Sequence, residues 1–312
     1  MTSMSKFNLL IVSIVIFSFI FVGFIILPLA SAPNIPGPNY RNVSVWTHVN
    51  ITNSKPEVLN ISIYETVNLS NRNITVSAGG LKSVTCNASV RDWNGFNDIK
   101  TVNATLYYIT NQSTNPDDNN THYTNSSCTL NASTGTYTGW YACSFNVIYY
   151  ANNGTWTCNV TAIDTYNKTG SLTNNTLFYP VYALNVTDGI DYGSVAVEDF
   201  SNDSNANITN LGNMAINVSV EGYGVSRGDG LAMNCSINGN ITVDNERYAT
   251  SSGVVYGSKN ILTSSSQLIP SLTMPKQFNS TMILNSTYWQ LFIPPNPAGN
   301  CTGWVLFTAQ TP

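Results

Sequence analysis

The sequence predicts an all-β protein in which two immunoglobulin-like β-sandwich domains follow an N-terminal hydrophobic helix. Three observations predict this class. Apolar and polar residues alternate in short segments, for example GTWTCNVTAID at 154–164, as they do in a strand with one buried face. Turn-forming residues separate such segments about every ten positions. Beyond the N-terminal apolar run, no segment has convincing helical periodicity.

The N-terminal helix is predicted from the uncharged apolar run 7–29, which follows Lys6. About twenty residues are enough for a helix to cross a bilayer. The small residues 30–32 match a signal-peptidase site, but this run is long for a signal peptide and Pro33 follows it directly. Residues 1–32 are therefore a signal peptide or a membrane anchor, and we favour an uncleaved anchor with its N-terminus inside. Either alternative leaves the remaining chain outside the cell.

A proline- and glycine-rich linker is predicted at 33–39, the first sandwich at 40–183 and the second at 184–312. The alternating pattern predicts strands of the first sandwich at 43–52, 58–64, 83–90, 101–108, 145–150, 154–164 and 177–184.

In the second sandwich, the pattern predicts strands within 184–199, 207–224 and 286–309. Turn chemistry interrupts the middle segment at Asn-Leu-Gly-Asn. The segment 247–273 is too irregular for its strands to be assigned from the sequence.

The six cysteines of an exported chain indicate disulfides. Fifteen pairings are formally possible for six cysteines. Strand logic favours three of them. Two cysteines lie on inward-facing strand positions about seventy residues apart, as in the inter-sheet bridge of an immunoglobulin domain. Two flank an apparent hairpin, and two remain for the second domain. The predicted pairs are Cys86 with Cys158, Cys128 with Cys143, and Cys235 with Cys301.

N-glycosylation is predicted because about two dozen asparagines begin an Asn-x-Ser/Thr triplet. On a strand, the asparagine and the hydroxyl residue two positions later share one face, which we expect to be wet. The alternative is that such pairs simply result from building wet faces without charged residues. The predicted glycosylation sites are Asn87, Asn103, Asn125, Asn131, Asn159, Asn167, Asn185, Asn217, Asn240 and Asn285.

Charged residues make up only 9% of the chain, and the net charge is −4. This composition has no basic stripe, so nucleic acid is excluded as a partner class. Calcium has one weak candidate site, a cluster of side-chain oxygens in DWNGFND, although a plain turn between two strands is the favoured interpretation. The candidate calcium ligands are Asp92, Asn94, Asn97 and Asp98.

No catalytic residue, metal site beyond this weak candidate or cofactor is predicted. The acidic residues are scattered, whereas glycoside hydrolysis needs two carboxylates placed across a cleft. The histidines are His48, in an expected strand, and His122, among glycosylation triplets, and neither has a recognisable nucleophile beside it.

Aromatic residues near the Cys128–Cys143 hairpin form a candidate interaction patch, centred on Trp140 and Tyr141 with Tyr149 and Tyr150 nearby. Exposed rings there would bind a partner surface or glycan. The alternative is that these rings pack inside the sandwich.

TCNASVRDWNG and GTWTCNVTAIDTYNKTGS resemble the immunoglobulin-like repeats of secreted archaeal surface proteins. NITNLGNMAINVSVEG and PAGNCTGWVLFTA are similar to sandwich domains of envelope and S-layer-associated proteins. The resemblance implies a non-catalytic, N-glycosylated surface or envelope structural protein, whose partners are the membrane through 7–29, its glycans, itself or other envelope proteins. The alternatives are an adhesin or receptor-like module and, more distantly, an exported glycan hydrolase.

Overall fold

The computed structural model describes residues 45–65, 72–186 and 189–312, which are almost entirely strands and turns. The predicted all-β class is confirmed. The predicted segments 1–32 and 33–39 lie outside the described residues. Within the described part of the chain, no helix is long and apolar enough to span a membrane. Short 3-10 turns occur at Phe96–Asp98 (η1), Val243–Asn245 (η2) and Tyr256–Ser258 (η3).

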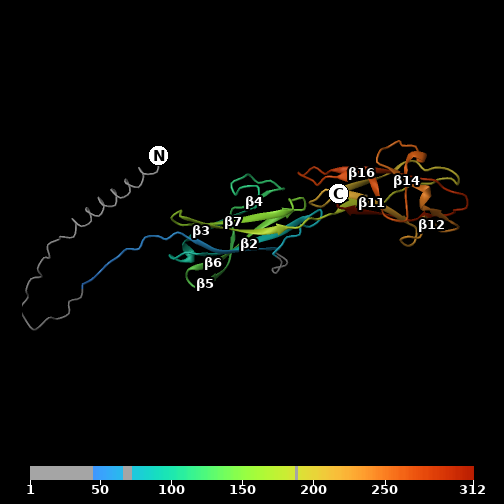
Figure 1. Ribbon diagram of the computed structural model, residues 1–312. Coiled ribbons are helices and arrows are strands. Elements are labelled where there is room, and N and C mark those ends of the chain that lie inside the picture. The colour runs from blue at the N-terminus through green and yellow to red at the C-terminus, as the bar shows by residue number, and fades with distance from the viewer. Residues whose placement is uncertain (1–44, 66–71, 187–188) are drawn as a thin grey trace, which may run out of the picture. The chain divides into compact units, whose positions relative to one another are not determined.

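Two four-stranded antiparallel sheets form the first sandwich (Figure 1). One has the order β1-β2-β6-β5 and the other the order β4-β3-β7-β8. The strands of the first sheet are Glu57–Glu65 (β1), Leu81–Arg91 (β2), Thr129–Thr134 (β5) and Thr138–Ile148 (β6). Those of the second sheet are Ile99–Tyr108 (β3), His122–Asn125 (β4), Gly154–Asp164 (β7) and Thr169–Phe178 (β8).

The core of the first sandwich lies between these two sheets. Along β7 the expected alternation is confirmed, because Trp156, Cys158 and Val160 are fully buried while the residues between them are half-buried. The Trp156 ring stacks on Phe178 at a centroid distance of 4.7 Å, and its indole N–H donates to the Asn152 carbonyl oxygen at 2.7 Å. The largest side chain of the core therefore has its one polar atom paired.

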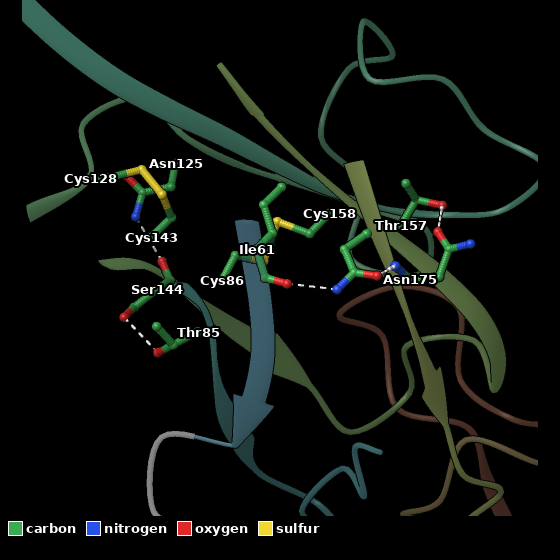
Figure 2. The surroundings of a disulfide bond; sticks show 11 residues. Ile61, Thr85, Cys86, Asn125, Cys128, Cys143, Ser144, Thr157, Cys158 and Asn175 are labelled. Carbon is green, nitrogen blue, oxygen red and sulfur yellow. Dashed lines mark hydrogen bonds between the residues drawn. A yellow bond between two sulfur atoms is a disulfide. The ribbon is translucent and has the colours of Figure 1, made fainter. Parts of the chain in front are cut away.

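Two disulfides hold the first sandwich, and both are the predicted pairs. Cys86 of β2 bonds to Cys158 of β7, so this bridge joins the two sheets through the core. Cys128 bonds to Cys143, beside the β5–β6 hairpin. Figure 2 shows the two bridges with the hydrogen bonds around them.

The outer face of β2 corrects one expectation. Thr85 and Ser89 were expected in water, yet they are only 3% and 5% exposed. The reason is that β2 is a central strand, with β1 and β6 paired on either side. Thr85 shares a hydrogen bond with Ser144 of β6 at 3.0 Å, so the Thr85 hydroxyl is paired with a side chain of the neighbouring strand (Figure 2).

The strand predicted at 43–52 is wrong for the residues described. Residues 45–56 have no regular secondary structure, and the first strand begins at Glu57. Val45, Trp46, Val49 and Ile51 are all more than three-quarters exposed. Alternation alone therefore did not make a strand here, because a strand needs a paired neighbour for its backbone groups.

Three antiparallel sheets make up the second half of the chain. Their orders are β15-β14-β17-β10-β9, β16-β11-β19 and β13-β12-β18. The first comprises Leu184–Val186 (β9), Ser204–Asn210 (β10), Glu246–Ala249 (β14), Asn260–Ile261 (β15) and Leu284–Leu291 (β17). The others comprise Ile216–Tyr223 (β11), Leu231–Cys235 (β12), Asn240–Thr242 (β13), Gln267–Met274 (β16), Cys301–Thr302 (β18) and Trp304–Gln310 (β19).

The third predicted disulfide, Cys235 with Cys301, joins paired positions of β12 and β18. Trp289 is fully buried in a core cluster built from the five-stranded sheet and the β16-β11-β19 sheet of this half. That cluster contains none of the residues that form the core of the first sandwich. The boundary predicted between residues 183 and 184 stays a prediction, since the whole of 52–312 forms one compact unit.

We expect the inter-sheet bridge to stabilise the first sandwich more than the hairpin bridge does. Their loops span 72 and 15 residues. Loop-closure entropy then gives about 4 kcal/mol for the Cys86–Cys158 bridge and about 3 kcal/mol for the Cys128–Cys143 bridge. Urea denaturation of the two paired Cys→Ala variants checks this order. A larger loss in the hairpin variant would contradict it.

Candidate functional site

The candidate calcium residues lie in the turn that leaves β2. Asp92 directly follows the strand, and Asp98 ends the 3-10 turn η1. Gly95 between them has φ of 114°, a backbone angle that favours glycine. The Gly95 N–H donates to the Asp92 carbonyl oxygen at 3.0 Å, and the Asp98 N–H donates to the Gly95 carbonyl oxygen at 2.9 Å. This tight turn brings the two aspartates together.

A third carboxylate, which the sequence analysis missed, completes the cluster. Asp164 is the last residue of β7, the strand whose core face carries Trp156 and Cys158. One oxygen from each of Asp92, Asp98 and Asp164 lies within 4.8 Å of the others. Asp92 and Asp164 are fully buried, and Asp98 is half-buried. Asp164 could have been identified from the sequence because it ends β7, and the predicted Cys86–Cys158 bridge joins β7 to β2.

The two asparagines of the predicted ligand set lie outside this carboxylate cluster. The Asn94 side-chain oxygen accepts hydrogen bonds from the Ser54 N–H at 2.8 Å and the Ser54 hydroxyl at 2.9 Å. The Asn97 side chain is exposed. Asn94 therefore holds the Ser54 segment against this turn. That Asn94 and Asn97 are calcium ligands stays a prediction.

The hydrogen bonds of the cluster leave three oxygen atoms open. Asp164 accepts from the Tyr166 and Lys168 N–H groups through Oδ1 and from the Asn53 amide, at 2.7 Å, through Oδ2. Asp92 Oδ1 accepts from the Asn94 N–H at 2.8 Å. Asp98 Oδ1 accepts a hydrogen bond from the Thr165 hydroxyl. The oxygens that remain, Asp92 Oδ2, Asp98 Oδ2 and Asn53 Oδ1, are buried and have no hydrogen-bond partner.

Burial and mutual repulsion act on the charges of this cluster. Burial raises the pKa of Asp92, and the negative charges of Asp98 and Asp164 raise it further, against the opposing hydrogen bond from Asn94. Burial also disfavours the charged form of Asp164, but hydrogen bonds from Asn53, Lys168 and Tyr166 outweigh it and lower the pKa of Asp164. Asp164 is thus held as a carboxylate beside a less readily ionised Asp92.

The predicted interaction patch is not a surface of exposed rings. Tyr141 is buried in the first core, and Tyr149 and Tyr150 are buried as well. Trp140 is half-buried, and its indole N–H donates to the Thr134 hydroxyl at 3.3 Å. Tyr141 faces inward because β6 is a central strand whose alternate residues pack on the core.

An exposed aromatic pair, which the sequence analysis did not identify as a surface, lies near the same hairpin. Trp93 is 55% exposed and Tyr137 is 44% exposed, with their ring centroids 5.5 Å apart. The Arg91 guanidinium lies 4.5 Å above the Trp93 ring. The hairpin therefore exposes different rings from those predicted.

The two histidines lie in unlike surroundings. His122 is buried, and its Nδ1 lies 2.8 Å from the Asp117 carboxylate, with the ring stacked on Tyr107. His48 is exposed and stacks on Trp46, outside any strand. The expectation that His48 lies in a strand is therefore wrong.

None of the ten predicted glycosylation asparagines is buried. Four are exposed: Asn131, Asn167, Asn185 and Asn240. The half-buried ones are Asn87, Asn103, Asn125, Asn159, Asn217 and Asn285.

The hydroxyl residues of these triplets differ more than the asparagines do. Ser133 and Thr169, which complete the triplets of Asn131 and Asn167, are exposed. Ser219, in the triplet of Asn217, is only 1% exposed and accepts a hydrogen bond from the Ser266 hydroxyl at 2.8 Å. Thr287, in the triplet of Asn285, is fully buried. The hydroxyls on central strands are thus covered, as they are on β2.

A second acidic group missed from the sequence is Glu246, the first residue of β14. It is 2% exposed, and its Oε1 accepts a hydrogen bond from the Tyr192 hydroxyl at 2.6 Å. Burial raises the pKa of Glu246 to about 7, although the Tyr192 hydrogen bond opposes the shift. Glu246 is a buried acid that ionises only near neutral pH.

No family model matches the chain, and no curated protein matches it. Among solved structures, it is similar to the CsuC–CsuE chaperone–tip adhesion subunit pre-assembly complex from the archaic chaperone-usher Csu pili of Acinetobacter baumannii. The identity is 12% and the TM-score 0.39, over 76% of this chain and 96% of the other. A chaperone–tip adhesin complex of CFA/I fimbriae is 7% identical, with a TM-score of 0.28 over 81% and 84% of the chains. Such distant likenesses carry no argument about activity.

Glu246 makes a testable contribution to the pH dependence of stability. The pKa of Glu246 rises from an ordinary 4.5 to about 7 in the folded protein. Burying the protonated side chain therefore costs no ionisation energy below pH 4.5, where the folded protein keeps its full stability with respect to this group. That stability is lost as the pH rises to about 7, by about 3 kcal/mol. Glu246→Gln should therefore be more stable than the wild type at pH 8 and equal to it at pH 4 in urea denaturation. The exposed Glu198→Gln is the control, and an equal effect of Glu246→Gln at both pH values would contradict the prediction.

Proposed function

We propose that the chain is a non-catalytic, N-glycosylated structural protein of the cell surface or envelope, of the kind found in archaeal surface proteins. It would be anchored through residues 7–29, with both disulfide-bonded halves outside the cell. The observation that carries the proposal is that four acceptor asparagines are exposed, two in each half: Asn131, Asn167, Asn185 and Asn240. Glycans at these positions would give solubility to a chain with only 9% charged residues.

The edge strands support this proposal. Every residue of β5 is exposed, and β8 is exposed over most of its length. β5 lies at the outer edge of its sheet, where unpaired backbone groups invite association with another chain. The end of β8 is already paired, since the Ile74 N–H donates to the Leu177 carbonyl oxygen at 2.8 Å. Asn131 lies on β5, so a glycan there would shield that edge. Three disulfides fit the oxidising compartment that the proposal requires.

Partners of this protein would be other copies of itself or other envelope proteins. The adhesin alternative cannot use Tyr141, which is buried, and would rest on the half-buried Trp140 with the exposed pair Trp93 and Tyr137. The abundance of acceptor triplets favours the structural role, which we keep as the one proposed function.

Glycan occupancy should follow the exposure of the whole triplet. We expect glycans on Asn131 and Asn167, where the hydroxyl residue is exposed, and none or few on Asn217 and Asn285, where it is buried. Intact-glycopeptide mass spectrometry of protein purified from its own cells measures this. Asn131→Gln and Asn167→Gln should each remove the glycan mass from one peptide only. A chain without glycans at any triplet would refute the glycosylation proposal.

A further inference from the structure

We infer that Asp92, Asp98 and Asp164, together with the side-chain oxygen of Asn53, form a calcium-binding site at the ends of β2 and β7. The three carboxylates lie within 4.8 Å of one another, and the Asn53 amide is hydrogen-bonded to Asp164 at 2.7 Å. The four residues come from three separate segments of the chain: the Asn53 segment, the turn after β2 and the end of β7. A cation there would hold together parts that the backbone alone does not connect.

The open oxygens provide the evidence that a ligand belongs in the cluster. Asp92 is fully buried, yet its Oδ2 has no hydrogen-bond partner, and the same is true of Asp98 Oδ2 and Asn53 Oδ1. A buried polar atom without a partner costs free energy, more so when it carries charge. A bound cation would supply the missing partner to all three oxygens at once.

The charge balance points the same way. Within the described residues, no lysine or arginine forms an ion pair with any of the three carboxylates. The positive charge of Lys168 acts on Asp164 without forming an ion pair with it. Arg91 pairs with Glu57 at 2.7 Å, and Lys100 donates to Asn167 at 3.2 Å. A divalent cation would offset the mutual repulsion of the carboxylates.

The donor set favours calcium among the common cations. Zinc prefers histidine and cysteine, and this cluster contains only oxygen donors. Magnesium requires a nearly regular octahedron and retains several waters. Calcium accepts an irregular set of carboxylate, amide and water oxygens, which matches ligands gathered from two strand ends, a 3-10 turn and the Asn53 segment.

The site would fix the entry of the chain into the first sandwich. Asn53 and Ser54 precede β1 and contact the loop after β2 and the end of β7. Calcium would join these contacts into one centre and form a second tie between the two sheets, in addition to the Cys86–Cys158 bridge. Loss of the cation should therefore loosen the segment around residue 53.

Calcium titration of the full chain tests the inference. The chain is purified in a non-ionic detergent, stripped with EDTA and titrated with CaCl2 in a calorimeter, and its thermal unfolding is followed with and without CaCl2. We expect one saturable site, a higher unfolding temperature with CaCl2, and at least about tenfold weaker binding for Asp98→Asn. Asp191→Asn removes an exposed carboxylate of another turn and should bind calcium like the wild type.

Asp92→Asn guards against a simple folding defect. Its side-chain oxygen can still accept from the Asn94 N–H, while one of three like charges is removed. In EDTA this variant should be at least as stable as the wild type, but CaCl2 should no longer raise its unfolding temperature. No saturable binding by the wild type up to about 10 mM CaCl2, beyond the affinity range of extracellular calcium modules, would overturn the inference. Undiminished binding by Asp98→Asn, equal weakening by Asp191→Asn, or tighter binding of MgCl2 would also overturn it.

Discussion

The structure of the first sandwich depends on the burial of one side of β2 and one side of β7 against each other. Cys86 and Cys158 lie on those sides and are joined, so the pairing of the two sheets is fixed covalently at the centre of the core. Trp156, two residues before Cys158, fills the space next to the bridge and stacks on Phe178. The same packing fixes where β2 and β7 end, and hence where Asp92 and Asp164 meet.

Polar but uncharged side chains form the outer faces of the sheets, where other proteins often place charged residues. On central strands they pair with one another across the sheet, as Thr85 does with Ser144 and Ser219 with Ser266. Each such pair contributes only about 1 kcal/mol, but it leaves few hydroxyls unpaired on a covered face. On edge strands the same residue types remain in water. Serine and threonine thus occur both on covered central strands and on exposed edge strands, which is why triplets of similar sequence differ in exposure.

The class of fold and the Cys86–Cys158 pair could be predicted from the sequence because they depend on local alternation, whereas the other two disulfides followed from an apparent hairpin and from elimination. The positions of Cys86, Cys158 and Trp156 follow from the inward parity of their strands. Strand order was not accessible, and this explains the errors. Tyr141 and Ser89 are buried because their strands are central, and 43–52 failed as a strand over its described residues because no neighbour pairs with it. Asp164 joins Asp92 only through the packing of distant strands, and Glu246 is buried by tertiary contacts that no local pattern reveals.

The proposed role as a structural surface protein makes a direct claim about neighbours in the envelope. Cross-linking of intact native cells, followed by mass spectrometry of peptides from this protein, examines that claim most directly. The account predicts abundant links at one reproducible pair of surfaces, between two copies of the chain or between it and another envelope protein. Links mainly to a protein outside the envelope, or a chain that cannot be cross-linked from outside the cell, would contradict it.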